Sequence, residues 1–241
     1  MHLTLTNILR NLFTSGIQEV PPAKSLEDED HRYIRGEVEN RSPCPGLNAL
    51  ANQGFLPRDG KDITPAQVEQ ALMTALHMDR LAARSLTSAL PPLCRPDGSF
   101  DLIDTRRHNV IEHDSSFTRL DFHQGDNHTF QPAMLQAMMD DADGGPVTLR
   151  SLAKTFMRRK RESRAGGAPR LPLGLWFVRL FQAVGVMNTA QTGGVLTKEL
   201  LEAVFIEERF PDVILNNPKP RTVFTLVGNA LGMLRYVILG P

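Results

Sequence analysis

The stretch Arg41-Ser-Pro-Cys-Pro-Gly-Leu-Asn-Ala-Leu-Ala-Asn-Gln-Gly54 places a cysteine between two prolines, directly before a short run of helix-forming residues. Pro43 keeps the residue before it out of helical geometry. Pro45 suits the first helical position, where its missing N–H costs no hydrogen bond. The apolar residues that follow share one helical face, and Gly54 is a natural stop. The sequence therefore predicts a helix with Cys44 at its N-cap.

The N-cap position gives Cys44 a chemical character. Free N–H groups and the positive end of the helix dipole favour an anion there, so they lower the pKa of a thiol and stabilise a thiolate. A thiolate can act as a nucleophile or bind a metal ion, and flanking prolines suit a ligand of fixed geometry. An inert buried cysteine at a helix start explains the same residues equally well.

A second polar segment runs from Arg106 to Asp121 and contains Glu112, His113, Asp114 and Ser116. A carboxylate beside a histidine can fix its tautomer and raise its basicity, which suits proton transfer. Glutamate and serine side chains four residues apart could share a hard cation such as Mg²⁺. A polar loop tied by local hydrogen bonds is the simpler alternative.

Two other site chemistries fit these residues less well. The first is a zinc site formed by four histidines: His108, His113, His123 and His128. Their four, nine and four intervening residues match no compact zinc pattern, but the nearby carboxylates could serve as further ligands, so zinc stays an alternative. A serine hydrolase would use Ser115 or Ser116, but neither serine lies in a Gly-x-Ser-x-Gly turn.

Composition limits the class of protein. The 241 residues carry 27 basic and 27 acidic side chains, a balance that does not favour nucleic-acid binding. Two cysteines exclude a disulfide framework, though not a single bridge. The basic run at 158–161 reads as a solvated helix face rather than a phosphate-binding patch. No stretch is apolar enough for a membrane span, because Asn229 and Arg235 interrupt the longest one.

Helical periodicity recurs and strand patterns are scarce, so we expect an all-α fold in a single domain over 1–241, with an N-terminal arm over 1–35. Thr64-Pro65 begins a helix that reaches about Leu90. Further helices are expected at 132–142, 148–164, 173–187, 197–209 and about 221–238. The segment from Arg95 to Phe130 is polar and weakly periodic, and such long irregular stretches tend to be functional.

The cysteine segment to Gly60 and the later Ile-Glu-His-Asp-Ser-Ser-Phe-Thr-Arg-Leu-Asp121 resemble the fungal haem-thiolate peroxidases. That family contains the chloroperoxidases and the unspecific peroxygenases, of which the short peroxygenases are the closer match. Glu207-Glu-Arg-Phe-Pro211 is similar to the family's late Glu-Arg-Leu-Pro segment. The resemblance covers 41–130 well and 195–212 fairly, and it implies a chloroperoxidase-like domain of about eight to ten helices around a haem.

The resemblance also implies roles for individual residues. Cys44 would be the axial thiolate ligand of haem b, which favours cleavage of an iron-bound peroxide. Glu112, Ser116 and the backbone carbonyl of His113 would hold Mg²⁺ with a haem propionate. His113 would lie on the distal side, oriented by Asp114, and support acid–base catalysis. The chain would be an oxidoreductase that uses hydrogen peroxide to oxidise an apolar or aromatic small molecule, as one specialised step in fungal secondary metabolism.

One element of the family pattern is missing. Its distal acid–base glutamate would fall within Pro172–Gly185, near Gly174, Leu175 or Trp176, and this stretch contains no carboxylate. Glu162 comes slightly early in the chain, whereas Glu199 and Glu202 come late. The alternatives are therefore a haem-thiolate protein without catalysis, acting as a sensor or scaffold, and a haem-free domain in which Cys44 is merely buried.

The N-terminal residues Met1–Glu19 have an amphipathic helix pattern without the unbroken apolar core of a signal peptide. We therefore expect an intracellular protein, or a secreted one if the N-terminus is a product of processing. The sequence carries no signal for an oligomeric state.

Overall fold

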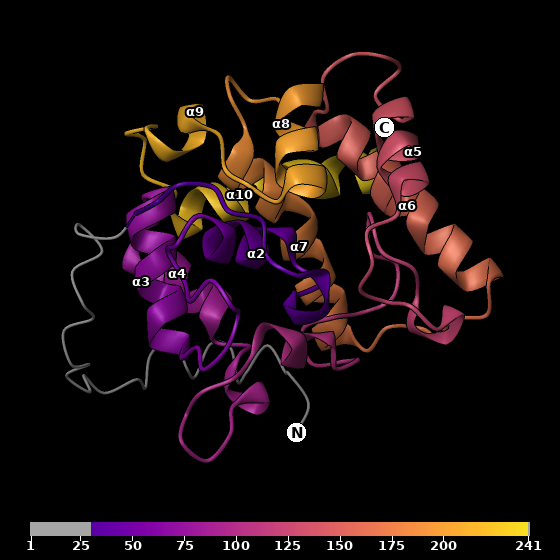
Figure 1. Ribbon diagram of the computed structural model, residues 1–241. Helices are drawn as coiled ribbons and strands as arrows, with labels where there is room; N and C mark the ends of the chain where they lie inside the picture. The colour runs from indigo at the N-terminus through magenta and orange to yellow at the C-terminus, as the bar shows by residue number, and fades with distance from the viewer. Residues whose placement is uncertain (1–29, 241) are drawn as a thin grey trace.

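Residues 30–240 are the part of the chain that this computed structural model describes, and within them nine α-helices and no β-sheet are found (Figure 1). The predicted all-α class is confirmed. The helices are α2 (Pro45–Asn52), α3 (Pro65–Leu76), α4 (Arg80–Thr87), α5 (Pro132–Asp140), α6 (Leu149–Ala165), α7 (Leu173–Ala190), α8 (Lys198–Glu202), α9 (Asp212–Leu215) and α10 (Val223–Leu239). Most of the predicted arm over 1–35 lies outside the described residues.

The single helix expected from Thr64 to about Leu90 is wrong, because two helices occupy that stretch. α3 begins with the predicted Thr64 cap and ends at His77, which adopts a left-handed conformation with φ of 49°. The Asp79 backbone N–H donates to the carbonyl of Arg221, and the Asp79 carboxylate caps α4 by accepting from the Ala82 N–H. A tertiary contact and a local cap thus divide the helix, which local periodicity cannot reveal.

The helix expected at 197–209 also changes character along its length. Lys198–Glu202 is α-helical, and Ala203–Glu207 forms a turn of π-helix that ends at Glu208 with φ of 53°. Turns of π-helix are rare and are frequently found at functional sites. Here the turn delivers the segment after it, Glu208 to Phe210, to the side of α2.

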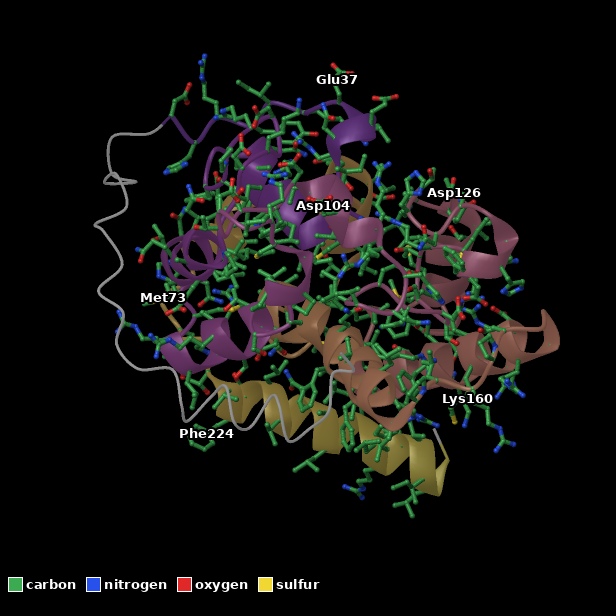
Figure 2. The ribbon with its side chains drawn as sticks, turned by 90° about the horizontal axis from the view of Figure 1, so that it is seen from below. Glu37, Met73, Asp104, Asp126, Lys160 and Phe224 are labelled. Carbon is green, nitrogen blue, oxygen red and sulfur yellow. The ribbon has the colours of Figure 1, made fainter. Side chains whose placement is uncertain are left out.

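α10 holds the helices together from one side. It packs along α6 and α7 and touches α4, and Figure 2 shows it running across the lower edge of the molecule. Leu226, Ala230 and Met233 form its buried face. The helix therefore packs against the domain, and no described helix has the length and apolarity to cross a bilayer.

The segment from Arg95 to Phe130 is irregular, as predicted, with only two short 3₁₀ turns, Leu102–Arg106 and Phe122–Gln124. It is nevertheless ordered by contacts with the start of α2. The Arg106 guanidinium donates to the carbonyl of Arg41, and Thr105 contacts Ser42. These bonds bring the polar loop and the cysteine turn, far apart in sequence, to the same side of the domain.

Candidate functional site

The turn that carries Cys44 is fixed by a chain of hydrogen bonds. Cys44 occupies the N-cap of α2, as predicted. Its backbone N–H donates to Ser42 Oγ at 3.0 Å, and the Ser42 hydroxyl in turn lies 2.6 Å from Thr105 Oγ1. Because Thr105 donates its own proton to the carbonyl of Leu102, Ser42 is the donor to Thr105. The Cys44 N–H and the Ser42 hydroxyl are therefore both used.

Asn48, one turn into α2, holds the same segment from the other side. Its side-chain oxygen accepts the Ser42 N–H at 2.8 Å, and its amide nitrogen donates to the Ser42 carbonyl at 2.8 Å. The same nitrogen donates to Glu208 Oε1 at 2.7 Å. Asn48 is almost fully buried, so its removal would leave these partners without compensation.

The end of α2 is joined to the segment after the π-turn by reciprocal bonds. Gln53 Nε2 donates to the Phe210 carbonyl at 3.0 Å, and the Phe210 N–H donates to Gln53 Oε1 at 2.7 Å. Asn52 Nδ2 donates to the Glu208 carbonyl at 3.1 Å. These roles were not predicted from the sequence. The signal was present as polar residues at 48, 52 and 53 within an otherwise apolar helix.

The Cys44 thiol is accessible to solvent, yet protein atoms crowd it on most sides. Burial raises the pKa of the Cys44 thiol, an effect opposed by the N–H groups of Leu47 and Gly46 and by the charge of Arg119. Exposure of the side chain together with strong desolvation indicates a group inside a concavity. The expected ionisation by the helix N-terminus is wrong for the free thiol, because desolvation outweighs it.

A buried ion pair lies near Cys44. Arg119 and Glu208 have side chains that are 4% and 13% exposed, with 3.8 Å between Arg119 Nη2 and Glu208 Oε1. Burial lowers the pKa of Arg119 and raises the pKa of Glu208. Arg119 Nε has no hydrogen-bond partner among the described residues, and the guanidinium lies over the Phe130 ring, 5.5 Å from its centre. A cation with an unused donor therefore lies close to the sulfur.

The loop from Glu112 to Ser116 brings together part of the predicted cation site. Ser116 Oγ donates to the backbone carbonyl of His113 at 3.0 Å, so two of the predicted ligand oxygens are neighbours. Glu112 Oε2 accepts from His108 Nδ1 at 2.8 Å, whereas Glu112 Oε1 is buried without a partner. Burial raises the pKa of Glu112, which marks a carboxylate that a cation would stabilise.

His113 is buried, with 2% of its surface exposed. Its Nδ1 lies 2.8 Å from the backbone carbonyl of Asp114, which fixes the proton on Nδ1 and leaves the lone pair on Nε2. The expected contact with the Asp114 carboxylate is not formed, because that carboxylate accepts the Phe122 N–H. Burial, with the nearby charge of Arg179, lowers the pKa of His113 and keeps the ring neutral.

Gln182 on α7 is a neighbour of His113 that was not predicted from the sequence. Its amide nitrogen donates to the Ile111 carbonyl at 2.9 Å. Its side chain also interacts with the His113 ring and raises the pKa of the imidazole, against the larger effect of burial. No donor lies within hydrogen-bond geometry of His113 Nε2 in residues 30–240.

The glutamates considered for the distal role are occupied elsewhere. Glu162 pairs with Arg158 and Arg159, and Glu202 lies 3.7 Å from Lys198. Glu199 is exposed at the start of α8. An amide, rather than one of these carboxylates, stands beside His113.

Neither the four-histidine zinc site nor the serine-hydrolase site is assembled in the described part of the chain. His108 pairs with Glu112 and His128 with Asp126, and the one group of metal-binding side chains there, Asp114, Asp121 and His123, includes a single histidine of the four. The Ser116 hydroxyl contacts the carbonyl of His113 rather than its imidazole, so it has no base to activate it.

The chain matches a known protein family and is similar to several characterised proteins. A family model described as "Peroxidase, family 2" matches residues 31–220. Aromatic peroxygenases from Cyclocybe aegerita and Coprinellus radians are both 29% identical, over 245 and 237 residues. These matches cover 86% and 84% of this chain, and 63% and 88% of the relatives' lengths. A dothistromin biosynthesis peroxidase from Dothistroma septosporum is 29% identical over 123 residues. That match covers 41% of this chain and 28% of the length of the relative.

The raised pKa of Cys44 predicts slow alkylation of the haem-free protein. With Cys94→Ser as background, iodoacetamide should modify Cys44 at neutral pH more slowly than it modifies the same chain in urea. Because the folded pKa lies above the unfolded one, the midpoint of the pH–rate curve should shift upward on folding. Mass spectrometry after timed quenching measures both curves. A folded midpoint below the unfolded one would show that the helix N-terminus, rather than burial, controls this thiol.

Proposed function

Because the chain belongs to the family 2 peroxidases, as its sequence motifs indicated, we propose that it binds haem b through Cys44 and uses hydrogen peroxide to oxidise a small organic molecule. The observation that carries the proposal is the Cys44 turn. Cys44 is exposed, while Ser42 and Asn48 hold the backbone around it. Such fixed geometry suits an axial ligand.

The residues around Cys44 fit a haem-thiolate. The N–H groups of Gly46 and Leu47 and the charge of Arg119 all favour negative charge on the sulfur. They are too weak alone to ionise it, but coordination to iron deprotonates a thiol outright. Bound haem supplies peroxide cleavage, which an axial thiolate promotes.

Proton transfer in this proposal depends on His113. Its Nδ1 is committed to the Asp114 carbonyl, so Nε2 is the atom that can take a proton from peroxide and return it. Gln182 cannot exchange a proton, and its side chain can only position the ring or the peroxide. The chain would thus perform with one imidazole the step that relatives with a distal glutamate perform with a carboxylate.

We further propose a Mg²⁺ site at Glu112 Oε1, Ser116 Oγ and the carbonyl of His113, completed by a haem propionate. The unpartnered buried oxygen of Glu112 and the adjacent pair of Ser116 and His113 support it. Oxygen ligands of this kind are those that Mg²⁺ prefers, and it keeps several waters besides. His108 competes for the same carboxylate through Oε2.

A non-catalytic haem-thiolate protein is the second candidate, because the side chain beside His113 is an amide. Peroxide-dependent oxidation of a one-electron dye separates the two functions. Turnover that follows added peroxide supports the enzyme, whereas bound haem without turnover supports a sensor or scaffold.

Replacing Cys44 tests the haem ligand. Wild-type protein supplied with haem should show, after reduction and addition of CO, the long-wavelength Soret band of a thiolate-ligated haem. Cys44→His should abolish that band, because imidazole lacks the thiolate's electron donation. Cys94→Ser should leave the spectrum unchanged. A colourless wild-type protein, or an unchanged band in Cys44→His, would refute Cys44 as the ligand.

Variants at the His113–Gln182 pair test the proton transfer. Gln182→Glu should raise the rate of peroxide cleavage by about tenfold or more, since general acid–base help is worth about 10²–10⁴ in rate. His113→Ala should lower that rate while the haem spectrum stays nearly unchanged. Stopped-flow mixing with peroxide measures both. If His113→Ala cleaves peroxide at the wild-type rate, the imidazole takes no part in the step.

Removing the Glu112 carboxylate tests the cation site. Glu112→Gln should lose the Mg²⁺ that remains with the wild-type holoprotein after gel filtration, as measured by atomic emission. Asp126→Asn, a change of equal charge in the same irregular segment, should retain it. His108→Ala should bind Mg²⁺ more tightly, because it removes the competing partner of Glu112. Equal metal content in Glu112→Gln and wild type would place the cation elsewhere.

A further inference from the structure

A hollow of about 420 Å³ lies between the end of α6 and the start of α7, close to the loop that carries His113. Basic side chains dominate its lining, with Lys160 on α6 marked in Figure 2: Lys160, Arg164, Arg170 and Arg179. Ser115 and the apolar side chains of Leu171 and Trp176 complete the wall with Pro169. No carboxylate lines it. The proposed peroxidase chemistry uses none of these groups.

The basic groups of the hollow lack ion-pair partners, unlike their neighbours on the same helix. Arg158 pairs with Asp141, and Arg159 pairs with Asp121 and Glu162. Within residues 30–240, none of the four basic side chains of the hollow has a carboxylate within 4 Å. Positive charge gathered in a concavity focuses the field and attracts an anion more strongly than scattered surface charge does.

Arg179 distinguishes the hollow from a basic helix face in contact with solvent, because its side chain is buried. It is 3% exposed, and its guanidinium stacks 3.6 Å above the Phe156 ring. Its donors reach only neutral carbonyls, those of Phe156 and Ser115. Burial, reinforced by Arg159, lowers the pKa of Arg179 to about 10. The Asp121 carboxylate acts on this charge from nearby, but it already pairs with Arg159. A buried charge that is only partly compensated is costly, and an anion in the hollow would lower that cost.

We propose that this hollow binds the carboxylate of an aromatic substrate, so that the chain selects anionic aromatic molecules for the oxidation proposed above. The guanidinium groups match a carboxylate, with which arginine forms paired charge-assisted bonds. Trp176 and Leu171 offer the ring an apolar surface. Arg179 lies one helical turn before Gln182 on α7, and Ser115 is two residues from His113. The hollow therefore lies beside the loop that carries His113.

A haem propionate offers the same carboxylate chemistry, so the test must separate the two sources. The chain contains one tryptophan, Trp176, and it lines the hollow. Protein labelled with 5-fluorotryptophan therefore gives one ¹⁹F resonance that reports binding there directly. The probes are 1-naphthoate and its neutral amide, which differ in charge and little in size.

Titration of the labelled holoprotein should show saturable shifts with 1-naphthoate at a Kd at least tenfold lower than with 1-naphthamide. Lys160→Gln/Arg170→Gln should reduce that preference at least threefold; neither side chain makes a hydrogen bond or ion pair in the described residues. Arg150→Gln/Arg235→Gln removes the same charge from exposed positions on α6 and α10, and should leave the preference unchanged. Arg179→Lys tests the buried position without deleting its charge and should weaken naphthoate binding.

Three results would overturn the proposal. The first is equal affinity for naphthoate and naphthamide. The second is an equal loss of preference in both double variants, which would reduce the effect to net charge. The third is naphthoate binding that appears only with haem dimethyl ester, which would assign the hollow to a propionate. The outcome is separable from the haem assignment, because the Cys44 spectrum can fail while the ¹⁹F titration succeeds, and the reverse.

Discussion

The reciprocal hydrogen bonds between α2 and the segment from Glu208 to Phe210 are the constraint on which the candidate site depends. Gln53 and Phe210 are 157 residues apart in sequence, and each uses both its donor and its acceptor on the other. All these groups are buried, so breaking one contact leaves unpaired polar atoms that cost about 1–3 kcal/mol each. The contact fixes the end of α2, while Asn48 fixes its beginning against Ser42 and Glu208. Cys44 is consequently held by elements from both ends of the chain.

The same packing decides the ionisation of Cys44. A helix N-terminus favours the thiolate, but the protein atoms around the sulfur desolvate it, and this desolvation has the larger effect on the pKa of the thiol. A thiol whose pKa is raised should be a weak nucleophile in the iron-free chain. If Cys44 binds haem iron as proposed, the iron must displace the thiol proton, and haem uptake then depends on pH.

The sequence was sufficient wherever local chemistry determined structure. Prolines at 43 and 45 placed Cys44 at an N-cap, and Thr64 and Thr222 cap the helices that their periodicity predicted. It failed where contacts distant in sequence decided the outcome. The break at His77 depends on a bond from Asp79 to Arg221, and the neighbour of His113 comes from α7. A search for a missing carboxylate could not find Gln182, because an amide in a helix has no local signature.

The distal side of the proposed haem combines a neutral histidine, an amide and a basic hollow, and these three features act on one another. Arg179 lowers the pKa of His113 as well as lining the hollow. Arg179 donates to the carbonyls of Ser115 and Phe156, so the wall of the hollow is tied to the loop that carries His113. If the hollow holds an anionic substrate as proposed, the charge of that substrate fixes it beside this loop. A neutral aromatic molecule would have only the apolar surface of Trp176 and Leu171 to hold it, and should therefore be oxidised more slowly.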